Sequence, residues 1–359
     1  MKVESISIQN FKRLKDLEIS FLDADLDEVR NRFLILGDNG MGKTTLLQAI
    51  ALPLSLCMKN IADFRQFNWN GWLPEHYFKG GDPRIELSIR FEEDELAATQ
   101  EIAHMWYDSR PADYRNQHTY VAPGSSSRVK LVLNGDYWRV GNSREEALQF
   151  QGRHYARSLL SRKPEARDYF QRLPGMFWFD QFRNLSNQQH HDLNDSGSER
   201  TRGGIASLRQ YLVDWKLRQG NAGSGDYLSV LERLFQQIFP NHSFDAVRTV
   251  PNDDAPGEEE RLFILNDGED TYELVEMSAG EQAIFPVLYE IVRQAITRSV
   301  VLIDEIDLNL HPPLAQRLVS ILPMLAPDCQ FIMTTHSEAV NAVMGEAQTY
   351  RLKGGNLCL

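Results

Sequence analysis

Three glycines, at positions 37, 40 and 42, lie in a short segment that ends in Lys43, Thr44 and Thr45. Glycine leaves room for main-chain N–H groups to approach a bulky anion, and it permits turns that gather several such donors. A lysine after such a turn supplies positive charge to phosphate oxygens, and a threonine hydroxyl is a ligand for Mg²⁺. We therefore expect a triphosphate site here, not a glycine turn beside an incidental lysine. The residues predicted to contact the triphosphate are Asn39, Gly40, Gly42, Lys43, Thr44 and Thr45.

Two carboxylates, Asp304 and Glu305, directly follow the apolar run Val300–Ile303. Such a run predicts a buried strand, and acids at its end would lie at the carboxyl edge of a parallel sheet, beside the phosphate loop. Asp304 would hold Mg²⁺ together with Thr44, and Glu305 would orient and deprotonate an attacking water. The alternative is that these two acids only solvate the end of the strand and have no role in a reaction.

The surrounding sequence predicts the elements that position these groups. Residues 32–36 (RFLIL) are typical of a buried central strand, and residues 46–56 of a helix. A strand at 299–303, a helix at 313–325 and a strand at 330–334 follow near the end of the chain. Strands that alternate with helices imply a mostly parallel sheet. Further strands are expected at 3–8, 17–21, 83–91 and 176–179, with a hairpin around Asn134-Gly135. The predicted fold class is α/β, a mostly parallel sheet flanked by helices, with an antiparallel β subdomain and a helical insert.

The composition excludes several classes of protein. The chain has 359 residues, of which 42% are apolar, and a formal net charge of −12, which weighs against a chain that coats DNA by itself. Cys57, Cys329 and Cys358 lie far apart, so neither a metal site nor a disulfide framework is indicated, and a reducing cytoplasm fits. The N-terminus lacks the apolar core of a signal peptide, and no apolar run approaches the roughly 20 residues that span a bilayer. We therefore expect a cytoplasmic protein without a membrane partner.

Residues 277–282 (MSAGEQ) resemble the signature sequence of ABC ATPases. The resemblance implies that Ser278, Gly280 and Glu281 belong to a segment that contacts the γ-phosphate of an ATP held by the opposite subunit. The plain alternative is a helix N-terminus, in which Ser278 caps the helix and Glu281 completes a capping box. Both interpretations can hold at once. The order of the motifs, with the signature upstream of the Asp304 strand, matches the ABC order.

Further segments resemble ABC motifs. His336, after the strand at 330–334, resembles the switch histidine that approaches the γ-phosphate. Gln181, in the sequence FDQFR, resembles the glutamine that contacts Mg²⁺ and the attacking water, with Gln66 as a competing candidate. Asn10-Phe11-Lys12 resembles the first-strand motif of SMC-like heads, which implies that Lys12 or Arg13 lies near the phosphates.

Residues 307–312 (DLNLHP) resemble the D-loop region of ABC ATPases, in the form with Leu-His-Pro that is typical of the DNA-repair and defence branch. This resemblance implies a dimer contact for the loop and no catalytic role for His311. Transporter subunits carry a different sequence here, so a transporter nucleotide-binding subunit is disfavoured.

The resemblance as a whole is to an ABC-type P-loop NTPase head of the SMC-like and OLD-like branch. It covers residues 1–91, predicted as ATPase lobe I, and 173–359, predicted as lobe II, with an insert at 92–172 between them. It implies an ATPase that converts ATP and water to ADP and phosphate, with ATP and Mg²⁺ as cofactors. Two copies, or a higher oligomer, would join through the ATP sites.

The chain offers neither a long coiled coil nor room for the nuclease domain of OLD proteins, so the resemblance implies a separately encoded effector. That effector would be a nuclease or toxin, as in bacterial anti-phage defence. The alternatives are a DNA-repair or SMC-like ATPase acting on DNA, and a nucleotide switch that barely hydrolyses, which Glu305 disfavours.

Two basic runs leave nucleic-acid contact open as an alternative to a solvated surface. They are Arg162, Lys163, Arg167 and Arg172, and Arg200, Arg202 and Arg209. The 92–172 insert is a candidate for contact with a partner or with nucleic acid. His190-His191 lacks partner ligands at a convincing spacing, so no metal site is expected there.

Overall fold

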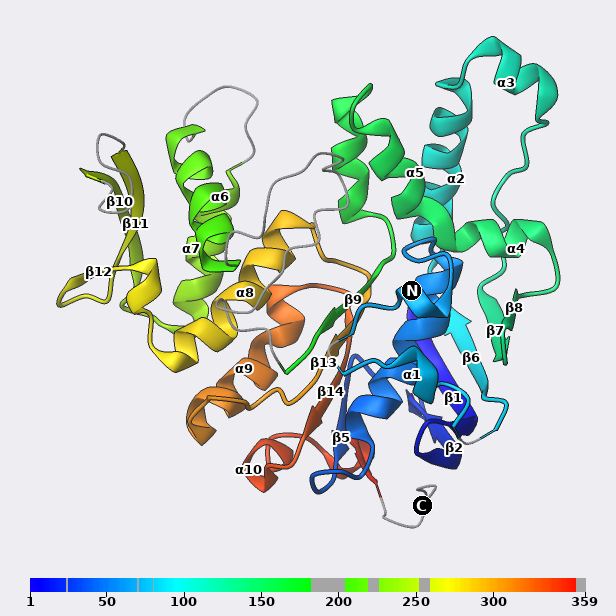
Figure 1. Cartoon of the computed structure of the whole chain (residues 1–359), viewed down its shortest axis with the longest axis horizontal. Helices are drawn as coiled ribbons and strands as arrows, with labels where there is room; N and C mark the ends of the chain where they lie inside the picture. The colour runs from blue at the N-terminus through cyan, green and yellow to red at the C-terminus, as the bar shows by residue number, and fades with distance from the viewer. Residues whose placement is uncertain are drawn as a thin grey trace. The chain divides into compact units, whose positions relative to one another are not determined.

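The computed structural model describes residues 1–352, apart from 24, 70, 80, 182–203, 219–225 and 252–258. The chain forms two compact units (Figure 1). Unit 1 comprises Met1–Asp180, Ala295–Ile306 and Leu322–Leu359, and unit 2 comprises Gln181–Gln294 and Asp307–Ile321. None of the described helices combines the length and apolarity that a bilayer-crossing helix requires.

A five-stranded parallel sheet in unit 1 confirms the predicted fold class. Its order is β15 (Thr349–Arg351), β5 (Arg32–Leu36), β14 (Gln330–Thr335), β13 (Val300–Ile303) and β9 (Met176–Phe179). All four pairings are parallel. The central strands β13 and β14 are buried along their whole length, and the residues of β13 are apolar on both faces of the sheet. Strand β15 is the last described element of the chain, and residues 353–359 lie outside the described part.

An antiparallel sheet forms the second layer of unit 1. Its order is β2 (Leu14–Ser20), β1 (Lys2–Phe11), β6 (Arg84–Arg90), β7 (Arg128–Asn134) and β8 (Tyr137–Val140). A short ribbon of β3 (Leu22–Asp23) and β4 (Glu28–Val29) follows β2. The predicted hairpin at Asn134-Gly135 is β7–β8, and it extends the sheet that β1 begins. This sheet crosses the boundary predicted at residue 91, and the division into lobe I (1–91), insert (92–172) and lobe II (173–359) stays a prediction.

Helix α1 (Lys43–Cys57) packs between the two sheets of unit 1. It contacts β1, β6 and β7 of the antiparallel sheet and β9 and β14 of the parallel sheet. Fourteen of its residues are buried, as expected for a helix with apolar neighbours on every side. The phosphate loop that precedes α1 is thus fixed to the centre of the unit.

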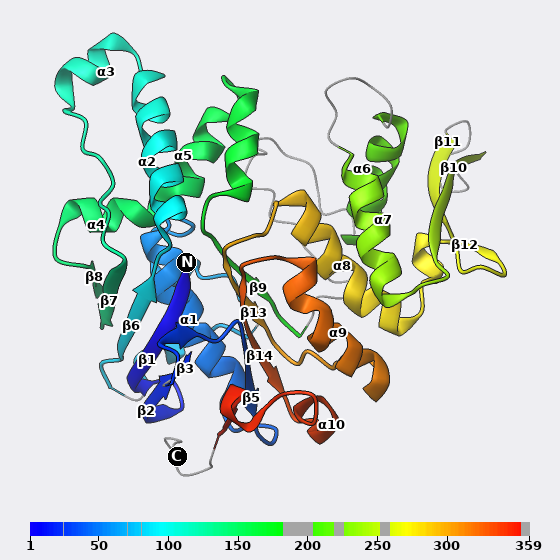
Figure 2. The same ribbon diagram turned by 180° about the vertical axis from the view of Figure 1, so that it is seen from behind.

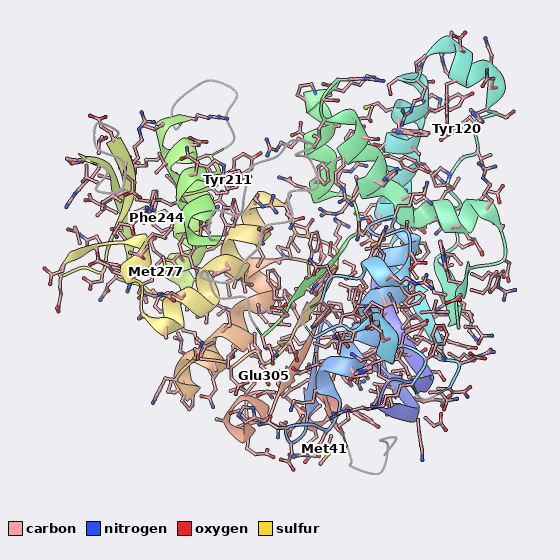
Figure 3. The ribbon with its side chains drawn as sticks, in the orientation of Figure 1. Met41, Tyr120, Tyr211, Phe244, Met277 and Glu305 are labelled. Atoms are coloured by element: carbon pink, nitrogen blue, oxygen red, sulfur yellow. The ribbon has the colours of Figure 1, made fainter. Side chains whose placement is uncertain are left out.

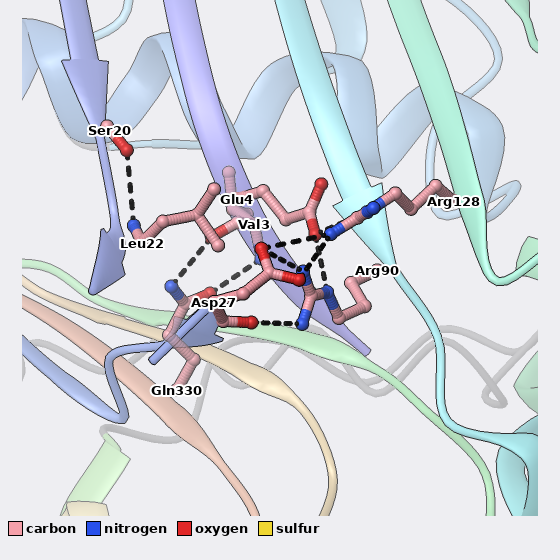
Figure 4. Close-up of polar contacts among 8 residues, drawn as sticks. All are labelled: Val3, Glu4, Ser20, Leu22, Asp27, Arg90, Arg128 and Gln330. Atoms are coloured by element: carbon pink, nitrogen blue, oxygen red, sulfur yellow. Dashed lines mark hydrogen bonds and ion pairs between the residues drawn. The ribbon is translucent and has the colours of Figure 1, made fainter. Parts of the chain in front are cut away.

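Polar contacts join the two sheets of unit 1 between β1 and the start of β14 (Figure 4). The buried side chain of Gln330, at the start of β14, accepts a hydrogen bond from Val3 N at 2.7 Å and donates one to Val3 O at 2.9 Å. Next to it, Glu4 pairs with Arg90 and with Arg128, whose Nε lies 2.9 Å from the Glu4 carboxylate. A buried glutamine with both ends satisfied holds β1 in register with β14.

The helical part of unit 1 forms a satellite core. It contains α2 (Glu93–Asp108), α3 (Ala112–Gln117), α4 (Arg144–Leu148) and α5 (Gly152–Leu159), and Figure 2 shows it from behind. Apolar residues of α2 and α5 share one cluster that includes Ile102, Tyr155 and Leu159. The buried Arg153 guanidinium donates to the carbonyls of Leu173, at 3.2 Å, and Phe170, at 2.9 Å, which ties α5 to the start of β9.

The described part of unit 2 contains three complete helices, the first part of a fourth and a three-stranded antiparallel sheet. The helices are α6 (Gly204–Arg218), α7 (Tyr227–Ile238) and α8 (Ala279–Arg293), and the strands are β10 (Ser243–Pro251), β11 (Glu259–Asn266) and β12 (Thr271–Glu273). Helix α9 (Pro312–Leu325) begins in unit 2 and ends in unit 1, where the short α10 (Glu338–Asn341) also lies.

Candidate functional site

The predicted phosphate loop connects β5 to α1 in unit 1. Gly40 and Gly42 adopt φ angles of +82° and +92°, in the left-handed region that favours glycine. Gly42 is the N-cap of α1 and contributes no side-chain cap, so the helix begins at Lys43 with its N-terminal N–H groups facing the loop. This arrangement suits an anion at the helix N-terminus.

The Lys43 side chain is buried and folds back over this loop. Its ammonium donates to the carbonyl oxygens of Gly37, at 2.7 Å, and Asp38, at 3.0 Å. Asn39 is exposed at the outer turn of the loop, and Thr45 is buried in the first turn of α1. The positive charge of Lys43 therefore lies beside the same loop as the N-terminus of α1.

The structure brings Thr44 and Asp304 together, although 260 residues separate them in the sequence. Thr44 Oγ1 donates to Asp304 Oδ2 at 2.7 Å, and the Asp304 side chain is fully buried. The contact forms because β13, which ends at Ile303, lies in the same sheet as β5, which leads into the phosphate loop. Met41, in the loop, and Glu305, after β13, are labelled in Figure 3.

The donors at this point fit Mg²⁺. A threonine hydroxyl and a carboxylate are hard oxygen ligands, and Mg²⁺ is usually held by one or two such protein groups, together with water and phosphate oxygens. Within the described residues, no group of three or more His, Cys, Asp or Glu side chains could hold a metal by itself. The site therefore suits a metal that arrives with a phosphate, not one caged by protein ligands alone.

Sequence reasoning missed Thr334, which connects the two predicted acids. Its hydroxyl donates to Asp304 Oδ1 at 2.5 Å and accepts from Glu305 N at 2.8 Å. Its carbonyl accepts from Ile306 N at 2.9 Å. Glu305 has a φ of +48°, an uncommon conformation for a residue with a side chain, and these bonds hold it there. The signal in the sequence was a pair of threonines directly after the apolar residues Phe331, Ile332 and Met333.

Lys12 and Arg13 lie in the turn between β1 and β2. Lys12 Nζ donates to the side chain of Gln48 on α1 at 2.8 Å and lies 5.1 Å from the centre of the Trp72 ring. Burial, with a smaller effect from Arg13, lowers the pKa of Lys12 to about 8. Arg13 Nη1 lies 3.5 Å from Gly40 O of the phosphate loop. Nothing in the sequence singles out Gln48, which is almost fully buried on the same helix as Thr44.

The remaining catalytic candidates follow strands of the parallel sheet. His336 is exposed directly after β14. Gln181 is half-buried in a turn that follows β9. The competing Gln66 lies in a short helical turn, where its side-chain oxygen accepts a hydrogen bond from Ala62 N at 3.0 Å. The catalytic roles of His336 and Gln181 stay predictions.

The signature-like segment forms the N-terminus of α8 in unit 2. Ser278 caps the helix, and its N–H donates to the Glu281 carboxylate at 2.8 Å, so the capping box is present. Glu281 is buried, where Tyr272 and His242 also contact it. Ser278 itself is exposed and Gly280 is half-buried. The capping box therefore uses both side chains, with Ser278 Oγ accepting from Glu281 N at 3.3 Å, and Ser278 remains exposed to solvent.

The predicted D-loop packs beside this helix start in unit 2. A methyl group added at Gly280 would lie 3.4 Å from Leu314 Cδ2 and 3.9 Å from Asn309 O. Asn309 has a φ of +61°, which turns the chain just before His311. His311 is exposed. The two segments for which the sequence predicts dimer contacts are thus neighbours.

The two predicted basic runs differ in what their members contact. Arg172 forms an ion pair with Glu101 at 2.9 Å, and Arg162 Nη1 lies 3.5 Å from Ser109 O. Arg209 pairs with Glu260 and with Glu273, its Nε lying 2.7 Å from the Glu273 carboxylate, which makes it part of the packing of unit 2. Lys163 is half-buried. Arg200, Arg202 and the pair His190-His191 lie outside the described residues.

Comparison with known proteins identifies the family. The family profile "AAA domain, putative AbiEii toxin, Type IV TA system" matches residues 136–340, more than half of the chain. A second profile, "AAA ATPase domain", matches residues 1–114.

Three known proteins are similar over nearly the whole chain. The "Retron Ec83 probable ATPase" of Escherichia coli is 20% identical over 99% of this chain and 72% of its own length. The "Retron Vc95 probable ATPase" of Vibrio cholerae serotype O1 biovar El Tor is 20% identical over 95% of this chain and 71% of its own length. The "Septu protein PtuA" of Bacillus mycoides (strain KBAB4) is 26% identical over 93% of this chain, which spans 38% of that longer protein.

Two solved structures of SMC heads are also similar. The SMC head domain from Thermotoga maritima is 15% identical, with 96% of this chain and 92% of that chain covered and a TM-score of 0.44. An Smc head domain with an extended coiled coil, bound to the C-terminal domain of ScpA derived from Pyrococcus furiosus, is 14% identical, with coverages of 99% and 94% and a TM-score of 0.49.

The family matches and the retron ATPase relatives confirm the resemblance to nucleotide-binding ATPase heads that the motifs predict. The parallel sheet with a phosphate loop at the end of β5 agrees with this assignment. This chain belongs to the family "AAA domain, putative AbiEii toxin, Type IV TA system".

Proposed function

We propose that this protein is an ATPase whose two copies close around two molecules of ATP, each with Mg²⁺. The contact between Thr44 and the buried Asp304 carries the proposal, because it joins the phosphate loop to the acidic strand end at one point. Glu305, the next residue, is held in place by Thr334. A phosphate-binding helix start, two Mg²⁺ ligands and an adjacent carboxylate are the parts that triphosphate hydrolysis requires.

Each residue has a defined task in this proposal. Main-chain N–H groups from Asn39 to Thr45, with the Lys43 ammonium, bind the β- and γ-phosphates. Thr44 and Asp304 hold Mg²⁺, which neutralises negative charge on the phosphates. Glu305 accepts a proton from the attacking water. The residues predicted to assist are Gln181 at the metal and water, His336 at the γ-phosphate, and Lys12 or Arg13 at the phosphates.

The second copy would complete each site. Ser278 is exposed at the N-terminus of a 15-residue helix, so its hydroxyl and the helix N-terminus are accessible to a γ-phosphate held elsewhere. Gly280 presents its main chain without a side chain in the way, and Glu281 fixes the segment through the capping box. A two-fold dimer would then contain two equivalent sites.

The cellular role that we propose is control of a separately encoded effector, a nuclease or toxin, in bacterial anti-phage defence within the cytoplasm. The names of the matched family and relatives, which include a toxin, a type IV TA system and two retron ATPases, support this assignment. The difference between the closed, ATP-bound dimer and the open state would be the signal that the effector senses.

Glu305→Gln tests the proposal, because it removes the base and keeps the size of the side chain. We expect this variant to bind ATP and Mg²⁺ and to accumulate as a dimer in size-exclusion chromatography with light scattering. Lys43→Ala is the control, since it should lose ATP binding and stay open. A Glu305→Gln variant that binds ATP yet remains a monomer at every ATP concentration would contradict the dimer, and undiminished phosphate release would contradict the role of Glu305.

A further inference from the structure

Four cationic side chains lie together in the helical part of unit 1, around the neutral imidazole of His154, and we call these four the cationic cluster. They are Lys59, Arg110, Arg144 and Arg157. Arg157 Nη2 donates to the side chain of Asn60 at 2.9 Å, which joins α5 to the residue after Lys59.

Arg110 reaches the same place from the end of α2. Its guanidinium lies 4.1 Å from the Trp106 ring centre, and that ring lies 5.1 Å from the ring of Tyr155, the neighbour of His154. The cluster therefore draws on three segments that are far apart in the sequence: the end of α1, the end of α2, and α4 to α5.

No carboxylate forms an ion pair with Lys59, Arg110, Arg144 or Arg157 in the part of the chain that the structure describes. Glu145, next to Arg144, accepts hydrogen bonds from its own backbone N–H and from Ser143, which lower the pKa of its carboxyl, and Arg144 adds only a smaller attraction. Burial, followed by repulsion from Lys59, Arg157 and Arg110, lowers the pKa of His154 to about 4.

Arg110 and Arg157 are half-buried, and unpaired positive charge at such a position is unfavourable unless an anion neutralises it, whereas Lys59 and Arg144 are exposed. The chain as a whole carries a net charge of −12, so this local excess of cations is opposite in sign to the molecule. The charge pattern therefore fits a negatively charged ligand at this place.

Half-buried aromatic rings border the cationic cluster, and we call them the aromatic rim. The rim consists of Trp106, Tyr107, Tyr114 and Tyr120. The rings of Tyr107 and Tyr120 lie 5.2 Å apart, and those of Trp106 and Tyr114 lie 6.2 Å apart. Figure 3 shows Tyr120 well away from Met41 of the phosphate loop and from Glu305, all within unit 1.

We propose that the cationic cluster and the aromatic rim form a binding site for single-stranded nucleic acid. The cations would contact backbone phosphates, and the partly exposed rings would stack on bases, which is how single strands are bound without a strict sequence preference. An inorganic anion or an acidic peptide would use the charges but not the rings. This site is separate from the residues assigned to ATP, and it differs from the basic run at 162–172 that the sequence suggested.

Fluorescence anisotropy with a labelled 20-nucleotide oligothymidine, measured from 50 to 200 mM salt, tests the charged half of the site. We expect the wild-type protein to bind and Lys59→Gln/Arg110→Gln/Arg144→Gln to lose at least about tenfold in affinity. The slope of log affinity against log salt should become shallower by roughly 0.7 for each phosphate that the variant no longer neutralises. If the triple variant does not fold, Lys59→Gln/Arg144→Gln changes only exposed side chains. Lys79→Gln, at an exposed lysine of unit 1 outside the cluster, is the matched control.

Tyr114→Ala tests the aromatic half. We expect roughly a tenfold loss of oligonucleotide affinity with an unchanged salt slope, as removal of one stacking ring predicts. ATP binding, measured in parallel, should be unchanged in every variant, so failure of this site and failure of the proposed ATPase are distinguishable.

Three results would overturn the proposal. They are no oligonucleotide binding at 50 mM salt, wild-type affinity in the triple variant, and displacement of the oligonucleotide by polyglutamate of equal charge with Tyr114→Ala unaffected. The last result would assign the cluster to an acidic protein partner.

Discussion

A single threonine hydroxyl organises the acidic end of β13. Thr334 Oγ1 donates to Asp304 and accepts from the N–H of Glu305, while its carbonyl accepts from Ile306 N. The left-handed φ of Glu305 depends on this support, because few non-glycine residues adopt that conformation unaided. Thr334 thus positions the predicted metal ligand and the predicted base, and in the proposed reaction it would act only through these two neighbours.

Thr334→Val should therefore lower the rate of hydrolysis more than the affinity for ATP. Loss of the hydroxyl leaves Asp304 Oδ1 and Glu305 N without this hydrogen-bond partner, which should lower the free energy of unfolding by about 1–3 kcal/mol. Phosphate release at saturating ATP, compared with the dissociation constant of a fluorescent ATP analogue, separates the two effects. Thr334→Ser keeps the hydroxyl and should remain close to wild type. An equal loss of rate in Thr334→Ser and Thr334→Val would show that packing, not the hydroxyl, matters.

The lowered pKa of Lys12 predicts a pH dependence of ATP binding. With a pKa of about 8, the Lys12 side chain is positively charged at pH 7, and it loses this charge by deprotonation as the pH rises to 9. If Lys12 acts on the phosphates, ATP affinity should fall roughly fivefold over this range, about 1 kcal/mol for a partly screened charge. The Lys12→Arg variant should keep its ATP affinity up to pH 9. The Lys12→Gln variant should bind ATP weakly, with an affinity that does not change with pH. A wild-type profile as flat as that of Lys12→Gln would exclude Lys12 from the site.

The start of α8 combines a structural and a proposed functional element. The capping box of Ser278 and Glu281 fixes the first turn, and it accounts for these two residue types without any ligand. Because Ser278 is exposed, it is also accessible to a second copy of the chain. The two roles differ in what they demand of the side chain, since a cap needs only an acceptor, while a phosphate contact excludes a negative charge.

Substitutions at Ser278 separate these roles. Ser278→Asp should keep the cap and the thermal stability, because aspartate caps helices as well as serine does. It should also abolish ATP-dependent dimer formation, since the carboxylate would face a phosphate. Ser278→Ala should cost about 1 kcal/mol of unfolding free energy and weaken the dimer less. An ATP-dependent dimer of normal stability with Ser278→Asp would leave capping as the only role of this residue.

For the whole molecule, a dimer with two composite sites predicts complementation. Lys43→Ala removes the phosphate lysine and Ser278→Asp blocks the partner's approach, so neither variant alone should hydrolyse ATP. In an equimolar mixture, half of the dimers would be mixed, and each mixed dimer would contain one intact site. Phosphate release should therefore recover to about a quarter of the wild-type rate. No recovery in a mixture shown to exchange subunits would contradict sites shared between copies.

Local sequence patterns determined the elements and the chemistry that each can carry. The apolar runs at 32–36, 300–303 and 330–334 specify the parallel strands, and the glycines at 40 and 42 specify the loop before α1, because these features depend on neighbours along the chain. The capping box at Ser278 could be predicted for the same reason.

Tertiary structure alone decided which groups meet. Thr44 bonds to Asp304, Thr334 bridges Asp304 and Glu305, and Gln48 holds Lys12, and each of these contacts joins strands or helices that lie far apart in the sequence. The cationic cluster likewise forms only when the segments after α1 and α2 meet α4 and α5. The spacing of residue types along a chain predicts helices, strands and turns. The distance between two side chains that are far apart in the sequence depends instead on how whole helices and strands pack.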